Sequence, residues 1–131
     1  IHRFERARRD GIDNVTLWGS GTPRREFLHV DDLADACVRL LETYDAPTPI
    51  NIGTGKDMSI AELAVLVANI VGYEGEILWD TTRPDGTPRK ILDVKAMFAL
   101  GWSPRIGLSS GVRSTLEFFR RSFDTDSSGP S

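Results

Sequence analysis

Short β-branched runs alternate with helical patterns along this chain, and glycine or proline separates most of them. The alternation lacks the regular strand–helix–strand repeat of a large parallel sheet, and no internal repeat is visible. It therefore predicts an open, small α/β lobe that needs a larger partner lobe to cover it. The strands are predicted at 15–18, 25–30, 50–52 and 75–80, and the helices at 1–10, 33–41, 60–71, 94–100 and 108–123.

The predicted helices carry recognisable signals at their ends. Gly11 follows an arginine-rich turn and predicts a stop for the first helix. Asp31 or Asp32 is predicted to cap the second helix, and Ser59 with Glu62 forms a capping box before the third. The two aspartates are thus interpreted as a helix cap rather than as an acid–base pair.

One face of the second helix is apolar at helical spacing, which predicts that this face is buried. This face includes Cys37, whose thiol is expected to be buried and structural, because no nearby group would lower its pKa. Trp102, further along, is predicted to be a core anchor. The predicted buried face consists of Leu33, Ala36, Cys37, Leu40 and Leu41.

Length and composition limit the classes of protein to which this chain can belong. The chain has 131 residues, 40% hydrophobic and 27% charged, as in one soluble globular domain. A net charge of −3 argues against nucleic acid as a partner, no apolar run could cross a membrane, and one cysteine fits a reducing cytoplasm. Residues 1–123 are predicted to fold, starting as if from the middle of a longer sequence. Residues 124–131 are predicted to be a disordered tail, in part a remnant of cloning.

Two segments combine the groups that a ligand with a flat or sugar face and an anionic group would need. Trp18 precedes a tight turn and Arg25 follows it, so a ring and a guanidinium come close together. Arg3 is either a solvated charge or a further contact with the same ligand. The loop 81–90 is either a solvated charged loop or a pre-ordered phosphate clamp, because two prolines brace its cations. These cations are Arg83, Arg89 and Lys90.

No catalytic centre is recognisable. With only His2 and His29, neither a metal-ligand set nor a serine–histidine–acid triad can be assembled, and His29 is expected to be structural. No Tyr-x-x-x-Lys pair occurs. The Gly-x-Gly at Gly53 and Gly55 lacks the third glycine and the later acidic residue of a dinucleotide site, so a tight strand-to-helix turn is the preferred interpretation.

Four motifs together resemble the C-terminal part of the GDP-L-fucose synthase family, whose members are GDP-4-keto-6-deoxy-D-mannose 3,5-epimerase-4-reductases and extended short-chain dehydrogenases/reductases. The resemblance covers about residues 1–120. The first and last motifs are the more particular to this family, whereas many nucleotide-sugar epimerases and dehydratases share the other two. The motifs are Trp18-Gly-Ser-Gly-Thr-Pro23, Arg25-Glu-Phe-Leu-His-Val-Asp-Asp32, Asn51-Ile-Gly-Thr-Gly55 and Pro84-Asp-Gly-Thr-Pro-Arg-Lys-Ile-Leu-Asp93.

The resemblance implies an NAD(P)-binding, Rossmann-like family of which this chain is the small substrate-binding lobe, with the Rossmann core largely absent. In such enzymes the N-terminal lobe binds NADP and carries the catalytic residues. Arg3, Trp18, Arg25 and Lys90 match substrate-binding positions of the family. Glu76 departs from the pattern, because some members place an arginine there against the nucleotide.

The implied function is the GDP-sugar-binding part of a cytoplasmic, homodimeric enzyme. That enzyme converts GDP-4-dehydro-6-deoxy-D-mannose to GDP-L-fucose by 3,5-epimerisation and NADPH-dependent 4-reduction. This chain alone is expected to be inactive, since Cys37 does not match the family's catalytic cysteine. Two alternatives stay open: the C-terminal lobe of another nucleotide-sugar epimerase or dehydratase, and a stand-alone, non-catalytic nucleotide-sugar-binding module.

Overall fold

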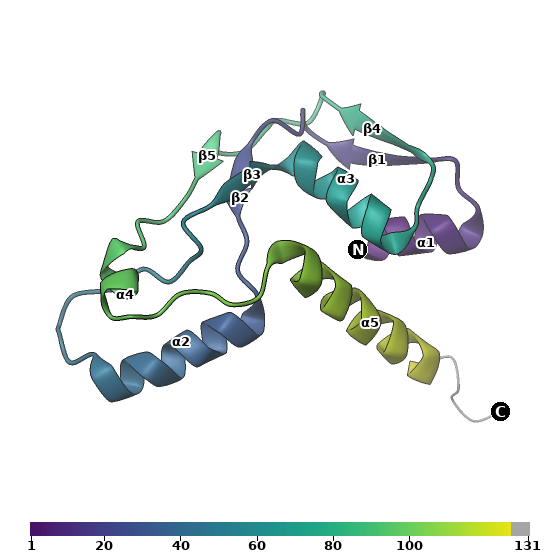
Figure 1. The fold of residues 1–131 in the computed structure, drawn as a ribbon. Helices are drawn as coiled ribbons and strands as arrows, with labels where there is room; N and C mark the ends of the chain where they lie inside the picture. The colour runs from purple at the N-terminus through teal and green to yellow at the C-terminus, as the bar shows by residue number, and fades with distance from the viewer. Residues whose placement is uncertain (127–131) are drawn as a thin grey trace.

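A computed structural model describes residues 1–126, and the side chains of residues 1–122. Five helices and five short strands follow one another in these residues (Figure 1). The helices are α1 (His2–Asp10), α2 (Val30–Thr43), α3 (Ile60–Val71), α4 (Lys95–Ala99) and α5 (Leu108–Asp126). The strands are β1 (Asn14–Trp18), β2 (Arg24–Glu26), β3 (Asp57–Ser59), β4 (Glu76–Asp80) and β5 (Arg89–Lys90).

The strands form two small sheets. In the first, β1 and β4 pair in parallel, with Trp18 opposite Asp80. In the second, β2 is central, antiparallel to β3 and parallel to β5. The predicted open α/β lobe is confirmed, because a few short strands alternate with helices that cover them only in part.

The larger core lies where α1, α3 and α5 pack against the β1–β4 pair (Figure 1). Apolar residues of α3 alternate with the period of a helix, and the capping box of Ser59 and Glu62 begins that helix as predicted. Gly11 ends α1 in the left-handed conformation, also as predicted. The buried members of this core are Phe4, Ala7, Val15, Ala64, Val67, Ala68, Val71, Tyr73 and Leu116.

A second, smaller cluster holds α2 and α4 together at the other end of the molecule (Figure 1). It contains three buried residues, Ala36, Met97 and Trp102. The Trp102 indole N–H donates to Asp35 at 2.9 Å, so the prediction of a core anchor is confirmed. Asp32 is buried and accepts hydrogen bonds from the backbone N–H groups that precede α5.

The predicted buried face of α2 is wrong in large part. Cys37 is exposed, and Leu33 and Leu41 are 41% and 87% exposed, because the small cluster contacts only the side of the helix that carries Ala36 and Leu40. The cap is also different from the prediction. The helix begins at Val30 with His29 as its N-cap, whose Nδ1 accepts from the backbone N–H of Asp31 at 3.2 Å.

The strand predictions at 25–30 and 50–52 need correction. β2 ends at Glu26, and residues 50–52 are not a strand; the strand of that region is instead 57–59, just before α3. Sequence patterns cannot locate such short strands, because a three-residue strand is set by its partner. Helix α5 continues to Asp126, beyond the predicted end at 123, and the rest of the predicted tail lies outside the described residues. Within residues 1–126, no helix has both the length and the apolar character needed to cross a membrane.

Candidate ligand-binding site

Trp18 lies at the end of β1, and the residue is 65% exposed. Two guanidinium groups lie near its ring centroid, Arg3 at 5.8 Å and Arg83 at 5.2 Å, within the range of cation–π attraction. Arg3 reaches the strand from α1 and donates to the Thr16 carbonyl at 3.3 Å. A hollow of about 380 Å³ opens beside Arg3 and Trp18. The structure therefore brings Arg3 close to Trp18, one of the other predicted ligand residues.

Arg25 and Lys90 lie side by side because β2 and β5 pair in parallel, and the pairing sets these two residues opposite one another. Arg25 is half-buried and its Nη1 donates to the Arg24 carbonyl at 2.7 Å, whereas Lys90 is exposed. Both line a hollow of about 270 Å³. We refer to Arg3, Trp18, Arg25 and Lys90 together as the ligand grip.

The three cations of the 81–90 loop have different roles, because Asp57 binds Arg89. Its carboxylate accepts from both Arg89 and Arg24 and so ties β5 and β2 to β3. The hydrogen bond from Arg89, supported by Arg24, lowers the pKa of Asp57 despite the opposing effect of desolvation. Arg89 is thereby committed to the sheet. Of the predicted phosphate clamp, Arg83 and Lys90 remain as candidates for ligand contact.

The turn at Gly53 and Gly55 binds a carboxylate of the chain itself. Glu26 accepts hydrogen bonds from the backbone N–H groups of Thr54, Gly55 and Leu92. Burial opposes ionisation of Glu26, but these three N–H groups outweigh it and lower the pKa of the carboxyl. The predicted strand-to-helix turn needs correction, because no strand directly precedes residues 53–55 and β3 rather than a helix follows them. The segment is nevertheless structural, since the Glu26 carboxylate occupies its N–H groups.

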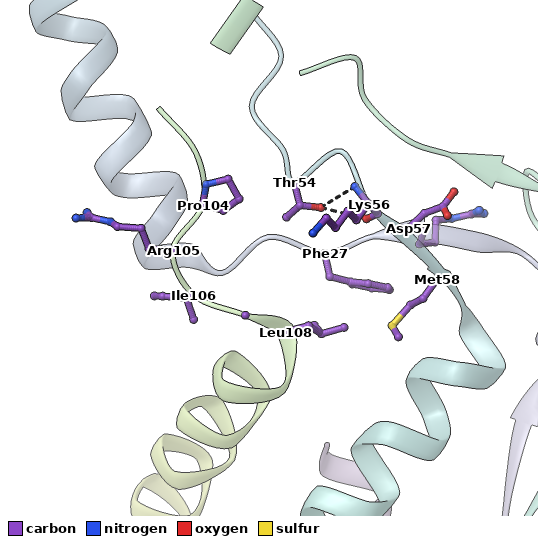
Figure 2. A pocket seen from close by; sticks show the side chains of 11 residues that line it. Phe27, Thr54, Lys56, Asp57, Met58, Pro104, Arg105, Ile106 and Leu108 are labelled. Atoms are coloured by element: carbon purple, nitrogen blue, oxygen red, sulfur yellow. Dashed lines mark hydrogen bonds between the residues drawn. The ribbon is translucent and has the colours of Figure 1, made fainter. Parts of the chain in front are cut away.

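A further hollow of about 410 Å³ lies between β2, β3 and the start of α5, and it shares Arg25 with the smaller one. Figure 2 shows Phe27, Met58 and Leu108 gathered along one side of it, with Thr54 and Lys56 along another. Arg105 also borders this hollow, but its guanidinium pairs with Asp35 on α2 at 2.9 Å. The apolar side and the mixed polar side would suit a ligand with both characters.

His29 is structural, as predicted. Its Nδ1 caps α2, and its Nε2 lies 3.2 Å from the Ser114 hydroxyl of α5. Because Nδ1 accepts a hydrogen bond, the ring proton resides on Nε2 and donates to Ser114. In the part of the chain that the structure describes, no cluster of three or more His, Cys, Asp or Glu side chains could hold a metal ion.

The predicted ligand residues thus form two pairs, Arg3 with Trp18 and Arg25 with Lys90, each beside its own hollow. Glu76 lies at the opposite end of β4 from the residue paired with Trp18, about 13 Å away at the rise of a strand. The sequence indicates Arg83 only as one of the three cations of the 81–90 loop, and it indicates no role for Asp57. The signal for Arg83 was its place directly before the Pro84-Asp85-Gly86 turn signal. Asp57 had no such signal, because its partners are distant in sequence.

The sequence of this chain matches known proteins over most of its length. Residues 1–53 match the NAD dependent epimerase/dehydratase family. The chain is 49% identical to GDP-L-fucose synthase 1 of Arabidopsis thaliana over 119 residues, which are 91% of this chain and 37% of that protein. The chain therefore spans about a third of the length of such curated relatives.

Solved structures give the same result. A GDP-mannoheptose C4 reductase from Campylobacter jejuni with NADP bound, MlghC, superposes with a TM-score of 0.80 at 35% identity over 91% of this chain and 42% of that one. A UDP-glucose 4-epimerase from Thermotoga maritima with UDP-glucose superposes with a TM-score of 0.78 at 29% identity over 93% and 39%.

Fold and sequence point to one class: the chain is similar to part of extended short-chain dehydrogenases/reductases of the NAD-dependent epimerase/dehydratase type. Within that class, the resemblance to the GDP-L-fucose synthase family is confirmed, and the chain corresponds to a C-terminal piece of such a protein.

Proposed function

We propose that this chain is the GDP-sugar-binding part of a GDP-L-fucose synthase. The whole enzyme would convert GDP-4-dehydro-6-deoxy-D-mannose to GDP-L-fucose by 3,5-epimerisation and NADPH-dependent reduction at C4. The catalytic residues and the NADP site would belong to the lobe that this chain does not contain, so the chain alone should be inactive. A cytoplasmic, homodimeric enzyme is part of the same proposal.

The ligand grip carries this proposal. Within the grip, Arg25 and Lys90 place two cations together on β2 and β5, and Arg3 places a third near the exposed indole ring of Trp18. Arg83, which is not part of the grip, lies near the same ring. A diphosphate needs converging cations, arginine can contact phosphate oxygens in a bidentate manner, and a ring supports the flat face of a base or a sugar. Two charge-assisted contacts, at about 1.5–3 kcal/mol each, would supply a large part of a micromolar affinity.

Another nucleotide-sugar epimerase or dehydratase remains the competing function, because the UDP-glucose epimerase shares the fold. The two candidates differ in the base that they accept. NMR titration of the labelled chain with GDP and with UDP separates them. We expect larger and more saturable shifts with GDP around Trp18 and Arg25; stronger shifts with UDP would favour the competing family. The third candidate is a stand-alone, non-catalytic nucleotide-sugar-binding module. A longer gene product that contains both this chain and a Tyr-x-x-x-Lys pair would exclude it.

Arg25→Ala should weaken GDP binding by about 1.5–3 kcal/mol, because the half-buried side chain of Arg25 lines both hollows beside β2 and would make a charge-assisted contact with a phosphate. Calorimetry of GDP binding measures this change. Arg113→Ala, an exposed arginine on α5, is the matched control and should bind like the wild type. Unchanged affinity in Arg25→Ala would show that Arg25 does not belong to the binding site.

The expected inactivity of the chain alone has its own test. Oxidation of NADPH by the chain alone would contradict it.

A further inference from the structure

The turn that follows Trp18 is tied to a loop 65 residues away. Asp85 accepts two hydrogen bonds from Ser20, one from the backbone N–H at 2.9 Å and one from the hydroxyl at 2.6 Å. The Ser20 hydroxyl also lies 2.7 Å from that of Thr22, within the same turn. These bonds from Ser20 lower the pKa of Asp85, so the carboxylate is ionised at neutral pH. We call this contact the Ser20–Asp85 clip.

The turn is shaped to admit this carboxylate. Gly19 has a φ of +81°, and a Cβ there would lie 2.4 Å from Asp85 Oδ1. Any larger residue would push the carboxylate away from the Ser20 N–H group. Gly11 has a similar φ of +64°, but nothing lies within 4 Å of its Cβ position. The two glycines thus share a backbone conformation and differ in the close approach of a distant side chain.

Residues on either side of Asp85 contact the ligand grip. Arg83, two residues before, places its guanidinium 5.2 Å from the Trp18 ring centroid. Gly86, directly after, has its Cβ position 3.3 Å from Arg25 Nη2. The loop that carries Asp85 therefore passes near both pairs of the grip, and the clip attaches this loop to the turn after Trp18. Pro84, which restricts the backbone between Arg83 and Asp85, transmits this position to Arg83.

We propose that Asp85 is a positioning residue: through the Ser20–Asp85 clip it brings Arg83 to Trp18 as an additional ligand-binding cation. Arg83 is suited to this role because its side chain is 60% exposed and its one ion pair, with Asp80, is long at 3.8 Å. It can turn toward an anion without breaking a buried contact. The binding role of Arg83 rests on the proposed function, whereas its placement by the clip does not.

The placement is tested without ligand. The indole N–H resonance of Trp18, assigned with Trp18→Phe, reports on a cation near the ring. We expect Asp85→Ala and Gly19→Ala to move this resonance to the position that it has in Arg83→Ala, and to raise acrylamide quenching of Trp18. Gly11→Ala carries the same backbone strain without the clash and should leave the resonance unchanged. An unchanged Trp18 resonance in Asp85→Ala would overturn the placement.

The binding role is tested by a double-mutant cycle with GDP as the probe. Asp85→Ala and Arg83→Ala should each weaken GDP binding about tenfold, and the double variant should be no weaker than either one, because both remove the same contact. A purely structural role of Asp85 would give additive losses. Ser20→Asp combined with Asp85→Ser restores a carboxylate–hydroxyl pair and should recover part of the affinity.

The outcomes distinguish the two proposals. If the wild-type chain binds neither GDP nor UDP, the proposed function fails while the ligand-free experiment still decides whether the clip positions Arg83. If GDP binds and Arg83→Ala has wild-type affinity, the proposed function stands and Arg83 is not a ligand residue.

Discussion

Glu5 is a buried charged residue that three arginines hold in place. It is buried on α1, and its carboxylate accepts hydrogen bonds from Arg8 and Arg9 of the same helix and from Arg120 of α5. The hydrogen bond from Arg8, together with Arg120, lowers the pKa of Glu5 to about 2 against the opposing effect of burial. This carboxylate therefore joins the first helix to the last within the larger core.

Glu5→Gln should lower the free energy of unfolding at pH 6 by on the order of 3 kcal/mol. The folded-state pKa lies below the usual 4.5, so the stabilisation is present above pH 4.5 and is lost as the pH falls toward 2. Urea unfolding of both proteins between pH 6 and pH 2.5 measures the difference, which should shrink at the acid end. Glu117→Gln, at an exposed position of α5, is the control; a Glu5 difference that is constant with pH would contradict the assignment.

At the scale of elements, short strands are held in place by side chains from distant segments. Asp57 joins three strands through Arg24 and Arg89, and Glu26 joins the end of β2 to the 53–55 turn and to the segment after β5. Each carboxylate accepts several hydrogen bonds at once, so each replaces contacts that a longer strand would make with its neighbour. These links decide where Arg25 and Lys90 lie.

Gly53→Ala tests the link at the turn. A Cβ at Gly53 would lie 2.4 Å from Glu26 Oε1, so we expect a loss of about 1–3 kcal/mol in the free energy of unfolding. Thermal and urea unfolding measure it. In a Glu26→Ala background the clash is absent, and the same substitution should cost much less. Equal costs in both backgrounds would show that the turn does not depend on Glu26.

At the scale of the whole molecule, the two ends differ in how many apolar residues they bury. The α1–α3–α5 end has nine buried apolar residues, whereas the α2–α4 end has three. One side of α2 is apolar and exposed at Val30, Leu33, Val38 and Leu41, and a contiguous apolar face of this kind is typical of an interaction surface. We expect that this face is covered in a chain of the relatives' length.

The isolated chain should therefore self-associate through α2. We expect a concentration-dependent mass in sedimentation equilibrium, and a return toward the monomer in Val38→Lys with Leu41→Lys. Both side chains are exposed, at 57% and 87%, so the stability of the monomer should change little. Val65→Lys, at a 53% exposed position of α3, is the matched control. Association that persists unchanged in the double variant would place the interface elsewhere.

The sequence by itself determined what depends on neighbouring residues. Helix periods, the capping box of Ser59, the stop at Gly11 and the ring–turn–guanidinium order around Trp18 are local, because hydrogen bonds over three or four residues or a turn conformation produce them. The motifs of the ligand grip could be found in the same way.

Only the tertiary structure decided which partners meet across long sequence distances. It showed that Cys37 is exposed, that His29 reaches Ser114 of α5, that Asp57 commits Arg89 to the sheet, and that Asp85 reaches Ser20. The physical reason is common to all four. Burial and charge pairing depend on which segments pack together, and a period or a propensity carries no information about a partner dozens of residues away.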